Sequence, residues 1–328
     1  MDTGTHIVMG FALGGLATID PVVANDPATA QGVLIGVIIG SLAPDADTVL
    51  KLRNNAVYIR HHRGFTHSIP AVILWPLGIL TVLYPFYPDA NLLHLWLWIL
   101  LSIFLHVFVD IFNSYGTQAL RPFSSKWVAL GVINTFDPFI FGMHVIGLII
   151  WGLGADPVLT FLTMYAVIIG YYIVRVLLQA AVRHSIKSTI PKADSVIIAP
   201  TMRFYHWRIA AQTKEHFYVG RAYGRSITIF DKFNRKPVPD TAIFNKAQTD
   251  KNVNAFLSFS PLYRWELEEK DDQYEVRFID LRYRSNDHYP FVAVVQMDLD
   301  LNILSSYTGW IFSEEKLRKK LSFLHKKE

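Results

Sequence analysis

The 328-residue chain contains no cysteine, which excludes disulfides, thiolate metal sites and cysteine nucleophiles. A second absence is local, because residues 1–182 contain no glutamate and only seven lysines or arginines beside nine aspartates. Residues 183–328 hold the other 24 basic and 18 acidic residues. The first part is therefore typical of a membrane domain and the second of a soluble basic domain. The net positive charge of residues 183–328 suits a domain that lies beside anionic lipid, with nucleic acid as an alternative partner.

Apolar runs divide the first part into six segments separated by polar turns. They cover about residues 5–20, 28–43, 69–86, 92–112, 139–154 and 157–182. Their lengths are close to the roughly 20 residues that a helix needs to cross a bilayer. The second segment carries Gly32, Gly36 and Gly40, a spacing that lets a neighbouring helix approach closely. We expect residues 1–187 to form an α-helical integral membrane domain of about six helices.

The distribution of basic residues gives this domain an orientation. Lysines and arginines, among them Arg63, Arg121 and Lys187, lie in the loops after the second, fourth and sixth segments. The turns that alternate with these loops contain aspartate and no lysine or arginine; they lie near residues 20–28, 84–91 and 155–157. Because basic loops stay inside, we expect a multi-pass protein of the cell membrane with both termini in the cytoplasm.

Seven ionisable residues fall at the cytoplasmic ends of the expected helices. They are His6, Asp45, Asp47, His62, His67, His106 and Asp110. His106 and Asp110 are four residues apart, so they share one face of a helix and can meet a common partner. A random scatter over both interfaces would rarely place all seven on one side. A shared polar site at the inner boundary is therefore expected.

His62 and His67 belong to the sequence HHRGFTHS at residues 61–68, which directly precedes an apolar run. A regular helix would separate the two side chains by about 140° around its axis. A loop that turns into a helix can instead aim both imidazoles at one point. The alternative interpretation is a solvated loop that contacts lipid headgroups.

The chemistry of the seven side chains suits a divalent ion. Imidazoles and carboxylates without thiolates are typical ligands of zinc, with manganese or iron as alternatives, and a carboxylate can bridge two ions. We therefore expect one or two ions. Such an ion would supply a hydroxide nucleophile near neutral pH, and Asp47 and Arg63 are the catalytic candidates, with Arg63 stabilising charge on a phosphoryl or acyl oxygen.

Other polar residues in this region have simpler explanations. Thr66 and Ser68 are suited to cap the helix that begins near residue 69. Asn113 can either support a ligand or form a turn. His94 lies at the opposite interface, where we expect it to be solvated, whereas an inward role for His144 stays open.

Five short motifs follow one another along the membrane part: THIVMG, PDAD, HRGFTHS, LHVFVD and GTQALRPFS. In combination they resemble the YdjM-like family of LexA-regulated, membrane-bound, metal-dependent hydrolases, and the opening MDTGTH is similar to its Bacillus YfhP-like branch. The resemblance covers about residues 1–180. It implies a metal site formed by the seven residues named above and a distant kinship to zinc-dependent phospholipase C and P1-type nucleases. Short members of the family end near the membrane region, so the remainder is an extension.

The extension, residues 190–328, has a strand-like pattern. Stretches rich in aromatic and β-branched residues alternate with turns that contain Asn, Asp, Gly and Pro. We expect a soluble, cytoplasmic, antiparallel β-rich domain of about seven strands, one of them at residues 254–260. A C-terminal helix should begin after Ser313 and end near Leu324. No nucleotide loop or catalytic triad occurs here, which favours a regulatory or substrate-positioning role.

Two classes of function fit the whole chain. The first is a hydrolase that acts on an ester or phosphoester, such as a lipid-like substrate, at the cytoplasmic face. The second is a non-catalytic metal-binding protein, either a sensor, a regulator or a transporter. A transporter would place ionisable groups near the bilayer midplane and would often contain two repeats of interrupted helices. Neither feature is evident in the sequence, which favours the hydrolase.

Overall fold

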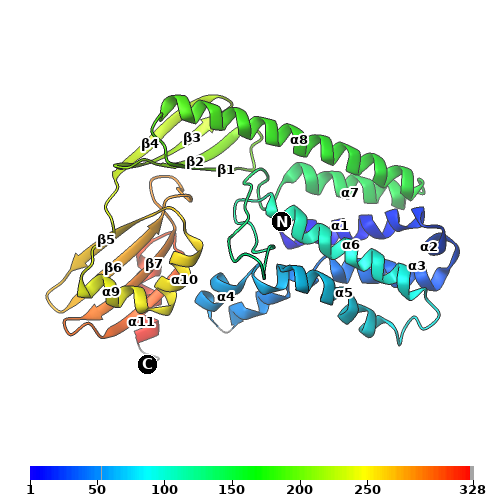
Figure 1. The fold of residues 1–328 in the computed structure, drawn as a ribbon, viewed down its shortest axis with the longest axis horizontal. Helices are drawn as coiled ribbons and strands as arrows, with labels where there is room; N and C mark the ends of the chain where they lie inside the picture. The colour runs from blue at the N-terminus through cyan, green and yellow to red at the C-terminus, as the bar shows by residue number, and fades with distance from the viewer. Residues whose placement is uncertain (53, 326–328) are drawn as a thin grey trace. The chain divides into compact units, whose positions relative to one another are not determined.

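The computed structural model describes residues 1–52 and 54–325, so Arg53, one of the basic residues expected in the cytoplasm, lies outside the described residues. The chain forms two compact units (Figure 1). The first comprises Met1–Asp47, His62–Ala181 and Ala199–His206; the second comprises Thr48–His61, Val182–Ile198 and Trp207–Glu328. The chain therefore leaves the first unit directly after Asp47 and returns to it at His62.

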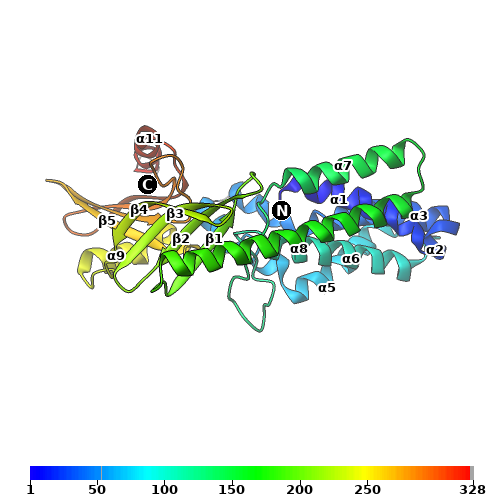
Figure 2. The ribbon, with the colours of Figure 1, turned by 90° about the horizontal axis from the view of Figure 1, so that it is seen from above.

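The first unit is built from helices. They are α1 (Thr3–Leu16), η1 (Ala17–Ile19), α2 (Pro21–Asn25), α3 (Pro27–Gly40), η2 (Ala43–Leu52), η3 (Phe65–His67), α5 (Ile69–Leu83), α6 (Leu92–Ile111), α7 (Pro138–Gly152) and α8 (Pro157–Thr189). Both η2 and α8 continue into the second unit. The six apolar segments expected from the sequence correspond to α1, α3, α5, α6, α7 and α8, which run side by side in both views (Figures 1 and 2).

Among the described residues, two helices are long and apolar enough to cross a membrane, namely α6 and α8. Two bent pairs bring the number of candidate spans to four. One pair joins α3 to η2 at 43°, and the other joins Asn55–His67 to α5 at 76°. Helices α1 and α7 are shorter, with 14 and 15 residues. By length and composition the helical region therefore has two to four candidate spans.

Close packing of α3 against α6 forms the centre of the helical core. Ile99 and Ile103 of α6 are fully buried. A Cβ atom at Gly36 would lie 2.8 Å from the Ile99 side chain, and one at Gly40 would lie 3.3 Å from Ile103. The glycines of α3 therefore permit the close approach that their spacing predicted. This contact fixes α6, whose last turns carry two of the expected ligands.

The turns that lack basic residues gather at one end of the helical unit. Asn91 N donates to Thr29 Oγ1 at 2.7 Å, and His94 Nδ1 lies 2.5 Å from Asp20 Oδ2. Helix α2 and the connection from α5 to α6 lie at this end, whereas the N-terminus lies at the other (Figure 1). The helical unit thus has two chemically different ends.

The second unit contains two antiparallel four-stranded sheets, in the orders β1-β2-β3-β4 and β5-β6-β7-β8. The strands are β1 (Ser195–Pro200), β2 (His206–Gln212), β3 (His216–Tyr223), β4 (Ser226–Asn234), β5 (Tyr263–Glu269), β6 (Gln273–Asp280), β7 (Phe291–Asp298) and β8 (Ile303–Trp310). Its helices are α4 (Asn55–His61), α9 (Ala242–Thr249), α10 (Lys251–Phe259) and α11 (Glu314–His325). The β-rich character and the terminal helix are as expected.

The prediction of a strand at residues 254–260 is wrong, because these residues belong largely to α10. Asp250 caps this helix by accepting from Asn252 N at 2.8 Å and from Val253 N at 3.0 Å. Val253 and Phe256, nearly one helical turn apart, are both fully buried. A capping residue and a helical period therefore outweigh the aromatic composition. Strand β1 was not expected, and the single stretch of strand-like residues at 216–233 forms two strands, β3 and β4, so the described residues contain eight strands instead of about seven.

Candidate metal centre

Local structure brings the expected ligands together from four segments of the first unit. Asp45 and Asp47 lie in η2, which follows α3, and His67 ends η3 just before α5. His106 and Asp110 occupy adjacent turns of α6, and both are fully buried. His6 comes from α1 and is also fully buried.

Four of these residues converge on one point: Asp45, His67, His106 and Asp110, whose donor atoms lie within 4.8 Å of one another. His67 Nε2 lies 3.4 Å from Asp110 Oδ2 and 3.7 Å from Asp45 Oδ1. His106 Nε2 lies 3.6 Å and 3.7 Å from the same two oxygens. Two ligands that are each about 2.1 Å from a tetrahedral zinc ion are roughly 3.4 Å apart. The four atoms therefore have nearly the spacing of a coordination shell.

The same four donor atoms are buried and accept or donate no hydrogen bond among the described residues: His67 Nε2, His106 Nε2, Asp45 Oδ1 and Asp110 Oδ2. A buried polar atom without a partner costs roughly 1–3 kcal/mol, and native structures contain few of them. Four such atoms facing one another are expected where an external cation supplies the missing interaction. The residues present therefore fit a metal ion.

Hydrogen bonds at the Nδ1 atoms of His67 and His106 leave the Nε2 atom of each ring available as a metal ligand. His106 Nδ1 lies 2.6 Å from the carbonyl of Ser41, which can only accept, so Nδ1 carries the proton. Thr66 Oγ1 donates its single proton to Asp47 Oδ2 at 2.8 Å and lies 3.1 Å from His67 Nδ1. The Thr66 oxygen therefore accepts from His67 Nδ1. Such partners fix the ring orientation that a metal requires.

A second group, Asp45, Asp47 and His62, lies beside the first and shares Asp45 with it. His62 Nδ1 is 2.7 Å from Asp47 Oδ1, and Asp47 Oδ2 accepts from the Arg63 backbone N at 2.9 Å. Both Asp47 oxygens are thus already bonded within the protein. This group differs from the first, whose donor atoms face one another without such bonds.

Exposure shows from which side the centre can be reached. The side chains of His67, His106 and Asp110 are 0% exposed, whereas those of Asp45 and His62 are 14% and 22% exposed. A molecule that approaches the four donor atoms from solvent would therefore meet Asp45 and His62 first.

Arg63 lies on the buried side of the centre. Its Nη2 atom is 3.2 Å from Asp110 Oδ2 and donates to the Met1 carbonyl at 3.0 Å. The residue has a φ of 58°, in the left-handed region that costs a non-glycine residue roughly 1 kcal/mol. In this turn the backbone N of Arg63 binds Asp47 and its guanidinium reaches Asp110.

His6 lies against the four-atom group but belongs to neither group. Its ring stacks on that of His106, with 3.7 Å between centroids and 15° between planes. His6 Nε2 is 3.5 Å from Asp110 Oδ1 and 3.0 Å from the α-amino group of Met1. His62 and His67 are also brought close, with ring centroids 6.4 Å apart, although they belong to different groups.

The roles of the polar residues next to the candidate ligands agree only in part with those expected from the sequence. Ser68 caps α5 as expected, because its Oγ accepts from Ala71 N at 3.4 Å. Thr66 is not a cap but joins Asp47 to His67, a role that its position next to a histidine could have suggested. Asn113 has both expected roles, since its Nδ2 donates to Asp110 Oδ1 at 3.3 Å and its Oδ1 accepts from two turn amides.

The other two histidines of the helical unit lie apart from these groups. His94 is paired with Asp20 at the opposite end of the unit, and its side chain is 26% exposed. His144 Nδ1 lies 2.8 Å from the carbonyl of Ile140, in its own helix α7. Neither belongs to the groups that could hold a metal among the described residues.

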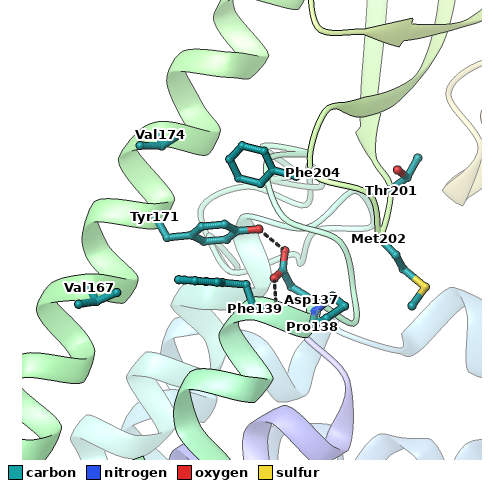
Figure 3. A pocket seen from close by; sticks show the side chains of 9 residues that line it. All are labelled: Asp137, Pro138, Phe139, Val167, Tyr171, Val174, Thr201, Met202 and Phe204. Carbon is teal, nitrogen blue, oxygen red and sulfur yellow. Dashed lines mark hydrogen bonds between the residues drawn. The ribbon is translucent and has the colours of Figure 1, made fainter. Parts of the chain in front are cut away.

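A separate, mostly apolar pocket lies between α7, α8 and residues 201–204 (Figure 3). Its main polar feature is Tyr171, whose hydroxyl donates to Asp137 Oδ2 at 2.8 Å. None of the seven candidate ligands lines this pocket. It is therefore distinct from the candidate metal centre.

Comparison with known sequences agrees with the motifs. The profile of the YdjM inner membrane protein family matches residues 1–182, which contain all seven candidate ligands. The chain belongs to this family. Profiles of the YfhP middle domain and the YfhP C-terminal alpha/beta plait domain match residues 191–233 and 242–321. The chain is 62% identical over 322 residues to a Bacillus subtilis (strain 168) protein named uncharacterized protein YfhP, and the match covers 98% of each chain. No solved structure matches the chain.

The expected family is thereby confirmed, together with its YfhP-like branch. Membership of an inner membrane protein family and the apolar helices indicate membrane association. The Asp and His cluster adds a centre that can hold a metal ion.

Proposed function

We propose that the chain is a membrane-embedded, metal-dependent hydrolase that cleaves an ester or phosphoester, such as a lipid-like substrate, at the cytoplasmic face. The observation that carries the proposal is the set of four buried donor atoms that face one another without hydrogen bonds. A purely structural cluster of polar residues would satisfy its own members. Membership of the YdjM family supports the placement of this centre in a membrane protein.

Charge favours one divalent ion over two. Asp45, Asp47 and Asp110 bring three negative charges to the centre, and Arg63 brings one positive charge within 3.2 Å of Asp110. The Met1 α-amino group also contacts Asp110, so with neutral imidazoles the net charge of these groups is −1 or −2. A second divalent cation would therefore leave an uncompensated positive charge in a mostly buried site. Two imidazoles and two carboxylates suit zinc first, with manganese or iron as alternatives.

The residues outside the four-atom group have separate tasks in this proposal. When bound, the ion would act as a Lewis acid and would lower the pKa of a water to near 7. His62, the most exposed imidazole of the centre, takes up or delivers a proton, and Asp47 orients it through the bond to Nδ1. Arg63 positions Asp110 and adds positive charge to the centre from its buried side.

The experiment is a comparison of metal content and hydrolysis in protein purified in detergent. Substrates are chromogenic phosphomonoesters, phosphodiesters and carboxylic esters. His67→Ala and Asp110→Ala should lose metal and activity together, because each removes a donor of the four-atom group. His62→Ala should keep metal and lose turnover. His94→Ala, a matched control at the other end of the helical unit, should keep both.

Hydrolysis that survives both ligand substitutions and exhaustive chelation would refute the mechanism. Stoichiometric metal without turnover on any ester would favour the alternative of a metal-sensing or regulatory membrane protein. These two outcomes separate the metal site from the catalytic part of the proposal.

The proposed topology has six passes with both termini in the cytoplasm. It is supported by the separation of the metal centre from the turns near Asp20, Thr29 and Asn91 at the opposite end. Because the chain has no native thiol, single cysteines can report the orientation. Asp89→Cys should react with a membrane-impermeant maleimide in intact cells, and Lys51→Cys only after permeabilisation. The reverse pattern would overturn the orientation.

A further inference from the structure

A small pocket in the second unit is dominated by arginine side chains. It has a volume of about 70 Å³ and lies between strands β2, β3 and β4 and residues 282–286. Four of its nine lining residues are arginines and none is acidic; the arginines are Arg208, Arg221, Arg282 and Arg284. These side chains come from two strands and a distant loop, so the tertiary fold assembles them.

The walls of the pocket are held by specific packing. The register of β3 against β4 shifts between Val219 and Gly220, and a Cβ atom at Gly220 would lie 2.3 Å from the Thr228 carbonyl oxygen. Only glycine therefore fits this bulge, which redirects the strand. On β4, the Phe230 ring contacts two guanidinium groups, with the Cζ atoms of Arg221 and Arg284 at 5.6 Å and 4.7 Å from the ring centroid. Cation–π contacts of this kind orient both arginines.

The positive charge of the pocket is only partly neutralised by the protein. Arg282 Nη2 is 2.6 Å from Asp280 Oδ2, and Arg284 Nε is 2.6 Å from Asp231 Oδ2. In the described part of the chain, no carboxylate forms an ion pair with Arg208 or Arg221. The positive charges of Arg208 and Arg221 therefore remain at the pocket. The other two lining arginines, Arg282 and Arg284, are held in place by carboxylates.

We propose that this pocket binds a phosphate group, carried either by a phospholipid headgroup or by a small phosphorylated solute. Planar guanidinium groups bind phosphate oxygens through paired, charge-assisted hydrogen bonds. A cavity needs roughly 10–15 Å³ of internal space to hold one water molecule, and this pocket has about 70 Å³. It therefore admits one phosphoryl group, while the remainder of the ligand stays outside. The site shares no residue with the metal centre and does not depend on its activity.

The experiment uses the full chain in phosphatidylcholine nanodiscs, treated with a chelator so that the metal centre does not bind phosphate. Calorimetric titrations use inorganic phosphate in one arm and soluble dihexanoyl phosphatidate in the other. The wild type should bind at least one probe. The double substitution Arg208→Gln and Arg221→Gln should weaken that binding by about tenfold or more, since it removes two guanidinium groups that can form charge-assisted hydrogen bonds with phosphate. Binding of phosphatidate alone would assign the site to a lipid headgroup, and tight binding of inorganic phosphate to a solute.

Arg225→Gln is the matched control, because this exposed arginine lies in the turn between β3 and β4 and does not line the pocket. It should change affinity by less than about twofold, as expected for a surface charge. The proposal is overturned if the double variant binds like the wild type, if the wild type binds neither probe, or if single-stranded RNA binds while both phosphate probes do not.

Discussion

Asp110 in the helical unit and Glu275 in the β-rich unit are both fully buried carboxylates, but their surroundings differ. Glu275 is bonded by Arg277 Nε at 2.6 Å, by Gln296 Nε2 at 2.8 Å and by Arg318. Asp110 Oδ2 lies 3.4 Å and 3.6 Å from two imidazole nitrogens and accepts no hydrogen bond among the described residues. The protein supplies hydrogen bonds to both oxygens of Glu275, whereas Asp110 Oδ2 accepts none and has an ion-pair contact with Arg63 at 3.2 Å.

The difference indicates that Glu275 stabilises the fold, whereas Asp110 is suited to bind a ligand. A buried ion pair that is complete in itself contributes to the fold and needs nothing from outside. Asp110 Oδ2 also faces two imidazole nitrogens that carry no proton, and a bound metal cation can interact favourably with all three atoms. We therefore expect metal to change the stability of the unit that contains Asp110, and not that of the unit that contains Glu275.

The largest effect on stability is expected from Glu275→Ala. Its removal breaks the hydrogen bonds with Arg277, Gln296 and Arg318. Because both arginines are partly exposed and keep Glu314 as a partner, the cost to the second unit should be about 2–3 kcal/mol. Hydrogen exchange of β6 and β7 peptides, followed by mass spectrometry, measures this loss. Glu268→Ala, an exposed glutamate on the neighbouring strand β5, should change protection by less than about 0.5 kcal/mol. Equal effects of the two substitutions would contradict the structural role of Glu275.

A smaller effect is expected from Gly36→Ala in the core of the helical unit. The added Cβ atom would lie 2.8 Å from the Ile99 side chain, so α6 must move or Ile99 must repack, at a cost of about 1–2 kcal/mol. Because α6 carries His106 and Asp110, metal content should fall as well. Gly78→Ala is the matched control, since nothing lies within 4 Å of its Cβ position. Thermal unfolding and metal analysis in detergent test both, and unchanged metal in Gly36→Ala would count against the role of this contact.

The effect of Asp45→Asn should depend on metal occupancy. In metal-loaded protein the substitution removes a donor atom and should lower the thermal midpoint. In chelator-treated protein it removes no bond to a metal, so the decrease should be smaller. Thermal midpoints with and without chelator measure both effects. An equal shift in both conditions would contradict the comparison between the two units.

The smallest effect is the pH dependence of the Glu275 network. Burial alone would raise the pKa of Glu275, but hydrogen bonds from Gln296 and Arg277, supported by Arg318, outweigh it and hold the pKa below its ordinary value of 4.5. The network therefore contributes stability above about pH 4.5 and loses it as the pH falls through the lower folded pKa. Unfolding measured against pH should show a shallower acid limb for Glu275→Gln than for the wild type. Parallel curves would show that this carboxylate does not couple to folding.

The sequence predicted which residues gather at one end of the helical unit, because helix periodicity and charge asymmetry act locally. The i, i+4 relation of His106 and Asp110 and the glycine spacing of α3 needed no tertiary information. The separation of His62 from His67 into two groups depends on the turn at Arg63, whose positive φ no local pattern indicated. The Ser41 carbonyl that orients His106 is a backbone atom 65 residues away, so composition cannot reveal it.

In the extension, the β-rich class followed from composition, but two elements did not. In helix α10, the aromatic residues Phe256 and Phe259 favour a strand by composition, whereas the cap at Asp250 stabilises the helix that forms. Strand β1 is only six residues long, and its apolar run at residues 196–199 is too short to indicate a strand by periodicity, although Pro191 and Asp194 precede it and Pro200 ends it. The arginine pocket combines residues of β2, β3 and the loop after β6, a long-range arrangement that only the fold reveals.

The most direct test of the central claim is metal analysis combined with X-ray absorption spectroscopy of the purified full-length protein. The four unsatisfied donor atoms should hold one divalent ion per chain, with nitrogen and oxygen ligands at about 2.0–2.2 Å and the scattering pattern of two imidazoles. His67→Ala and Asp110→Ala should lose this ion. Protein that retains no ion after metal supplementation, or an ion whose shell contains no imidazole, would contradict the claim.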